Sequence, residues 1–127
     1  MQEQHLYEYA VIRYVPHVER EEFINVGVIL FSKRQRYLGV RYQLNQDKIQ
    51  RLAPDTDFEM LQSNLEAFDK ICTGAKDGGP IAALDTPERF RWLTAVRSAS
   101  LQTSRPHPGF ANDLDITLEK LFQELVL

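Results

Sequence analysis

The chain opens with three short apolar runs that predict strands. Residues 7–15, 23–31 and 37–42 are rich in aromatic and β-branched side chains, and polar segments separate them. Runs of this length are typical of strands, and the absence of a helical pattern between them favours an antiparallel meander. A further alternating segment, 101–106, is either a fourth strand or an extended link.

Apolar residues at helical spacing fill most of the chain after residue 45. Residues that favour helix N-termini begin four of these segments, namely Asn45, Thr56, Thr86 and Asn112. Glu59, three positions after Thr56, indicates a capping box, and Gly74 offers a stop for the same helix. The glycine-rich segment 75–84 is expected to be a loop.

These elements predict a single α+β domain over residues 1–127. The sheet is expected to be antiparallel and three- to four-stranded, built from the N-terminal meander, with about four helices packed mainly on one face. At 127 residues the chain is long enough for one domain that buries roughly two thirds of its unfolded surface.

The second predicted strand, FINVGVILF, carries an asparagine and a glycine among apolar residues. Because side chains alternate along a strand, its aliphatic residues are expected to face the helices, namely Ile24, Val26, Val28 and Leu30. Asn25 and Gly27 then point to the opposite face. In the third strand the same rule places Leu38, Val40 and Tyr42 toward the helices.

Strand pairing predicts a polar cluster on that opposite face. A five-residue loop that pairs Phe31 with Tyr37 sets Gly27 opposite Arg41, and a similar turn sets Arg13 opposite Asn25. Cross-strand neighbours lie about 5 Å apart, so both guanidinium groups are expected to converge on a gap above Gly27.

Two occupants of this gap are consistent with the sequence. The functional alternative is an anionic ligand or a partner's carboxylate, because guanidinium groups pair well with carboxylates and phosphates. In the structural alternative a glutamate of the segment 19–22 pairs with Arg13, and Arg41 lies across Gly27. Glycine within a strand often marks a bulge or close backbone packing, which supports the structural alternative.

A second candidate surface lies on the predicted helix that follows Thr86. Arg91 and Trp92 are able to form a cation–aromatic pair that binds a nucleotide or a partner, and Arg97 follows on the same helix. The structural alternative for Trp92 is core packing, since an indole buries a large area.

Composition narrows the classes of function. A net charge of −3 argues against a general nucleic-acid binder, and the longest apolar run is too short to cross a bilayer. The single cysteine, Cys72, and an N-terminus without signal-peptide features predict a cytoplasmic protein. The three histidines, His5, His17 and His107, lack ligand spacing, so no metal and no cofactor is predicted.

No catalytic set is predicted either. An alternative function to binding is that of a phosphate-ester hydrolase or nuclease. In it Glu22 acts as base or metal ligand, beside Arg13, Arg91 and Arg97 as charge stabilisers. A further alternative is a homodimer through exposed aromatic residues of the second face, Phe23, Phe31 and Tyr37.

Three segments resemble a bacterial family catalogued as domain of unknown function 3037: YAVIRYVPHVEREEFINVGVILF, YLGVRY and RFRWLTAVRSASLQTSRPH. The resemblance spans nearly the whole chain and implies no activity. It implies a protein partner, because genes for similar proteins lie beside genes for HipA-like kinases, toxin components of some toxin–antitoxin systems. The sequence thus favours a binding or accessory module, whose candidate residues within these segments are Arg13, Glu22, Asn25, Gly27, Arg41, Arg91, Trp92 and Arg97.

Overall fold

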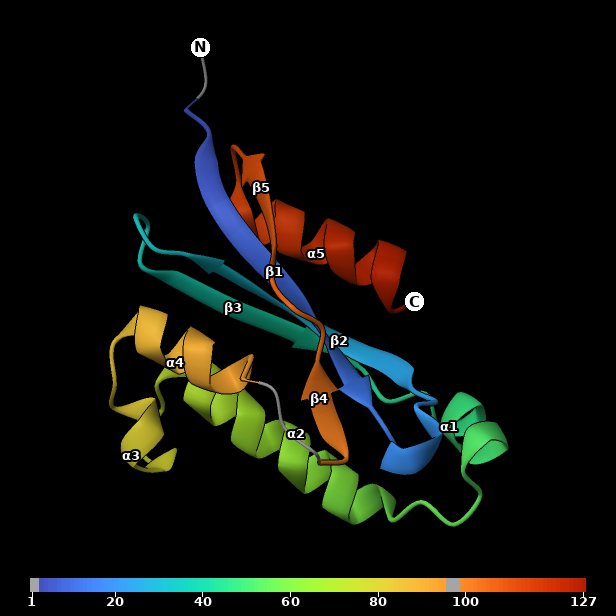
Figure 1. Cartoon of the computed structure of the whole chain (residues 1–127). Coiled ribbons are helices and arrows are strands. Elements are labelled where there is room, and N and C mark those ends of the chain that lie inside the picture. Colours follow the sequence, from blue (N-terminus) through green and yellow to red (C-terminus); the bar gives the residue numbers. More distant parts are fainter. Residues whose placement is uncertain (1–2, 96–98) are drawn as a thin grey trace.

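A computed structural model describes residues 3–95 and 99–127 and shows an antiparallel sheet between helices (Figure 1). The strands are β1 (His5–Tyr14), β2 (Ile24–Ser32), β3 (Tyr37–Tyr42), β4 (Leu101–Thr103) and β5 (His107–Ala111). The helices are α1 (Gln46–Leu52), α2 (Phe58–Thr73), α3 (Gly79–Ala82), α4 (Thr86–Leu93) and α5 (Leu114–Leu125), and a short 3-10 turn, η1 (Val18–Arg20), follows β1.

The sheet order is β3-β2-β1-β4, and β5 pairs with the other half of the same β1 edge. This confirms the predicted α+β class, its antiparallel meander and the strand in the segment 101–106. The fifth strand was not predicted, because the sequence HPGFA carries a proline and a glycine. Ser104 lies in the link between β4 and β5, and its hydroxyl accepts a hydrogen bond from the Val11 N–H of β1 at 2.9 Å.

A β-bulge in β2 changes which side chains share a face. Ile12 pairs with Gly27 and Arg13 pairs with Asn25, so Val26 lies between them without a partner on β1. Because one extra residue shifts the alternation, even-numbered side chains of β2 face the first cluster before the bulge, and odd-numbered ones face it after the bulge. The predicted faces of Ile24 and Val26 are therefore correct, whereas those of β2 from Gly27 onward are wrong.

Each face of the sheet has its own hydrophobic core. On the first face α2, α3 and α4 pack over a cluster that includes Val26, Ile29 and Phe31. On the second face α5 packs over Val28 and Leu30. The predicted orientation of β3 is confirmed, because Leu38, Val40 and Tyr42 contact the first cluster.

Helix boundaries follow local capping. Asn45 caps α1 as predicted, and its side chain accepts a hydrogen bond from the Lys48 N–H. The predicted capping box is wrong: Asp57 caps α2, and the Thr56 hydroxyl donates to the Ala53 carbonyl instead. The segment 75–84, expected to be a loop, contains the four-residue helix α3.

Candidate functional site

The arginine-lined hollow predicted on the second face is filled by α5. Arg41 forms a two-pronged contact with Glu119 of α5, with Nε 2.8 Å from Oε2 and Nη2 3.3 Å from Oε1. Its guanidinium carbon also lies 4.6 Å from the centre of the Phe122 ring. Arg41 therefore contacts the protein's own helix. The structural alternative is correct that the occupant is internal, but its details are wrong, because the carboxylate belongs to Glu119 of α5 and pairs with Arg41, not with Arg13.

Asn25 and Arg13 also have partners within the chain. The Asn25 amide donates to the carbonyl of Leu125 at 3.1 Å, which satisfies one of the last carbonyl groups of α5. The Arg13 guanidinium lies 4.2 Å from the centre of the Phe23 ring. The pairing of Arg13 with Asn25 is thus confirmed, while the predicted convergence of Arg13 and Arg41 on an empty gap is wrong.

Gly27 is required by close packing rather than by a ligand. A Cβ at this position would lie 2.8 Å from the Arg41 carbonyl oxygen and 2.9 Å from the Tyr42 Cβ. The predicted loop between β2 and β3 is one residue too long, because Ser32 pairs with Tyr37. Gly27 consequently faces Tyr42, not Arg41.

The remaining predicted site residues are dispersed. Glu22 is exposed after η1 and forms no ion pair within the described residues, so the glutamate–arginine cluster of the hydrolase hypothesis is not found there. Arg91 and Trp92 are exposed on α4, which packs at the end of β2 where Phe31 stacks on Phe90. Arg97 lies outside the described residues.

The aromatic residues of the predicted homodimer surface do not share one surface. Phe31 is buried in the first core, and the Tyr37 hydroxyl donates to Asp115 of α5 at 2.7 Å. Phe23 is 46% exposed at the other end of β2.

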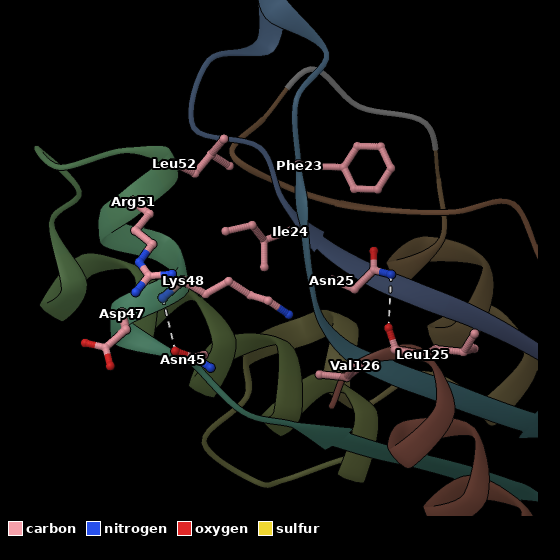
Figure 2. A pocket seen from close by; sticks show the side chains of 10 residues that line it. All are labelled: Phe23, Ile24, Asn25, Asn45, Asp47, Lys48, Arg51, Leu52, Leu125 and Val126. Carbon is pink, nitrogen blue, oxygen red and sulfur yellow. Dashed lines mark hydrogen bonds between the residues drawn. The ribbon is translucent and has the colours of Figure 1, made fainter.

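A cleft of about 700 Å³ opens where β2 begins, between α1 and the last turn of α5 (Figure 2). Its lining mixes apolar and polar side chains, and comprises Phe23, Ile24, Asn25, Asn45, Asp47, Lys48, Arg51, Leu52, Leu125 and Val126. Asn25 is the one predicted binding residue in this lining, and Arg13 contacts the ring of Phe23, which also lines the cleft.

Two cationic side chains of α1 give this cleft its charge. Lys48 and Arg51 are three positions apart, so they lie on the same side of the helix. Neither forms an ion pair within residues 3–95 and 99–127. Figure 2 shows the Lys48 side chain extending from α1 toward Asn25, while the Asp47 carboxylate points away from it. The cleft therefore presents unpaired positive charge beside an apolar wall.

Two buried polar atoms belong to Asn25, which lines the cleft, and to Arg13, which contacts the lining residue Phe23. Asn25 Oδ1 and Arg13 Nε, which belong to cross-strand neighbours, have no hydrogen-bond partner in the part of the chain that the structure describes. A buried group of this kind costs free energy unless a water or a ligand completes its hydrogen bonding.

Two further observations concern metal and thiol chemistry within the described residues. No group of three His, Cys, Asp or Glu side chains gathers to hold a metal ion in the described ranges. Burial raises the pKa of the Cys72 thiol to about 12, which favours the protonated thiol over the nucleophilic thiolate at neutral pH. Across the same ranges, no helix has the length and apolar character needed to cross a membrane.

Comparison with protein families matches residues 9–126 to a family described as protein of unknown function, DUF3037. The chain belongs to the DUF3037 family. This confirms the resemblance seen in the sequence over nearly the whole chain. Neither the curated proteins nor the solved structures contain a match.

In this DUF3037 protein, the sequence did not lead us to predict Lys48 and Arg51 as site residues. The available signal was a pair of cations three positions apart on a helix that Asn45 was predicted to cap. Their proximity to Asn25 depends on how α1 folds back beside β2, which is a tertiary contact that no local pattern encodes.

Proposed function

We propose that this DUF3037 protein is a binding module that holds an acidic segment of a protein partner in the cleft between β2, α1 and α5. The observation that carries the proposal is the unpaired pair Lys48 and Arg51 beside an apolar wall. Carboxylates form charge-assisted hydrogen bonds with such cations. Because Lys48 and Arg51 are both exposed, each contact is expected to contribute about 0.2–1 kcal/mol.

The shape of the cleft favours a chain segment over a small enclosed ligand. The cleft is open to solvent along one side, and Phe23, Ile24 and Leu52 line it next to the cations. An acidic peptide with interspersed apolar side chains supplies carboxylates for Lys48 and Arg51 and apolar groups for the remaining wall. Such a combination of a polar rim and an apolar centre is common in protein interfaces.

The family resemblance suggests where to look for the partner. A HipA-like kinase is the first candidate, because the resemblance implies a genetic association with such kinases. The proposal includes the cytoplasmic location that the single cysteine predicts.

Fluorescence anisotropy with a labelled peptide tests the proposal. The probe alternates glutamate with phenylalanine and leucine, and the control peptide has glutamine in place of each glutamate. We expect the acidic peptide to bind and the control peptide not to bind. The affinity for the acidic peptide should fall at high salt, because ions in solution screen the exposed contacts. Equal affinity for both peptides would show that the cations do not select the ligand.

Two double variants of equal net charge separate the cleft from general electrostatics. Lys48→Ala/Arg51→Ala removes the cations of the cleft, and Lys33→Ala/Arg34→Ala removes two exposed cations of the β2–β3 hairpin. We expect a loss of at least about tenfold in affinity from the first, which corresponds to about 1.4 kcal/mol, and little change from the second. The same loss from both variants would overturn the proposal.

A further inference from the structure

A second cleft of about 580 Å³ lies at the opposite end of the sheet. It is formed by the start of β1, the β2–β3 hairpin and β5. Leu6 and Phe110, which are cross-strand partners, line it and are 55% and 65% exposed. Two large apolar side chains side by side at the surface mark a site of association more often than two isolated ones do.

The position of the helices explains why this apolar pair is uncovered. Tyr7 and Tyr9 pack against the α5 core, so alternation turns Leu6 and Glu8 toward the first face. Figure 1 shows that β5 and the start of β1 extend beyond α2 and α4, which cover the rest of that face. The end of the first face therefore has no helix over it among the described residues.

Charges of both signs line the second cleft without pairing. Lys33 and Arg34 come from the hairpin, and Glu3 and Glu8 come from the start of the chain and from β1. No ion pair joins any of these four side chains to another described residue. Their formal charges sum to zero, which contrasts with the excess of cations in the first cleft.

We propose that a second copy of this chain occupies the second cleft and forms a two-fold symmetric dimer. In such an interface the same surface is used by both subunits, so an acidic part of one copy meets the basic part of the other. Lys33 and Arg34 of each subunit then face Glu3 and Glu8 of its partner, around a centre made by the two Leu6–Phe110 pairs. A partner with charge of a single sign would match only half of this lining.

Sedimentation velocity over a dilution series tests the dimer, and charge reversal tests its geometry. We expect the wild type to be a dimer that dissociates on dilution. Lys33→Glu/Arg34→Glu makes the lining wholly acidic, and Glu3→Lys/Glu8→Lys makes it wholly basic, so each variant alone is expected to be monomeric. Mixing the two restores both contacts across the two-fold axis, and we expect a mixed dimer.

Two exposed apolar residues provide a matched control for the centre of the interface. Phe110→Asp is expected to give a monomer, whereas Met60→Asp on α2, at a position that is 61% exposed and outside this cleft, is expected to leave the dimer intact. Circular dichroism verifies that each variant is folded. A wild type that stays monomeric at every concentration would overturn the proposal, as would charge variants that fail to associate when mixed.

The dimer and the peptide-binding function are independent in these experiments. Lys48→Ala/Arg51→Ala is expected to weaken peptide binding and leave the dimer unchanged, because the first cleft lies within one subunit. Lys33→Ala/Arg34→Ala is expected to weaken the dimer and leave peptide binding unchanged.

Discussion

The substitution Gly27→Ala tests whether this glycine serves the fold. The added methyl group would lie 2.8 Å from the Arg41 carbonyl oxygen, 2.9 Å from Ile12 Cδ1 and 2.9 Å from the Tyr42 Cβ. Favourable contacts between carbon atoms need about 3.5–4.0 Å, so β2 and β3 must separate at the bulge. Two of the three obstructing atoms belong to the β3 backbone or its Cβ and cannot rotate away.

The expected loss of stability follows from these contacts. Overpacking of this kind costs about 1–3 kcal/mol, and the stiffer unfolded chain of the alanine variant offsets about 0.4–1 kcal/mol of it. Because the obstruction comes largely from the backbone, the cost lies in the upper part of the overpacking range, and we expect a net loss of about 1–2 kcal/mol. With an unfolding entropy of about 2.1 cal/mol/K per residue, a chain of 127 residues should lose ~4–8 °C in Tm.

Differential scanning calorimetry measures this effect, and Gly39→Ala is the matched control. At Gly39 the obstructing atoms belong to the Tyr37 and Leu118 side chains and not to the backbone, so they can shift, although moving Tyr37 strains its hydrogen bond to Asp115. We expect Gly39→Ala to lose about half as much stability as Gly27→Ala, or less. If the Tm of Gly27→Ala equals that of the wild type, or is no lower than that of Gly39→Ala, close packing at the bulge is not the reason for the glycine.

Three further predictions concern single side chains. Burial and the hydrogen bond to Asp115 raise the pKa of Tyr37. The stability that this hydroxyl contributes is therefore complete below its ordinary pKa of 10 and is lost as the pH rises through the raised pKa. Tyr37→Phe should cost about 1 kcal/mol of unfolding free energy, measured by urea unfolding at neutral pH, and should weaken this alkaline loss. Hydrogen bonds from Gln123 and Arg41 lower the pKa of Glu119, so Glu119→Gln should reduce Tm at neutral pH and make little difference once acid protonates the wild-type carboxylate. The buried Cys72 thiol should react with a disulfide reagent only after unfolding, and rapid labelling of the native protein would contradict its placement.

Much of the fold could be predicted because its signals are local. The three opening strands, the cap at Asn45 and the stop at Gly74 each depend on a few neighbouring residues. Gly27 was expected to mark a bulge or close backbone packing in the structural alternative, and both are found. The extra residue, Val26, could not be located from the sequence, since its position is defined only once β1 is placed beside the strand. That one extra residue reversed the faces of Val28 and Ile29.

The candidate site was harder to predict because it depends on where helices pack. The apolar stripe of α5 was evident from its leucines, but its position over Val28 and Leu30 follows from the reversed alternation beyond the bulge. Once α5 lies there, Arg41 and Asn25 become its anchors rather than free donors.

A titration followed by amide chemical shifts tests the central claim most directly. With the acidic peptide as probe, the largest shifts are expected at Asn25, Lys48 and Arg51 and in the last turn of α5, with little change along the β2–β3 hairpin. Shifts centred on the hairpin, or no shifts at all, would contradict the assignment of the cleft between β2, α1 and α5 as the binding site.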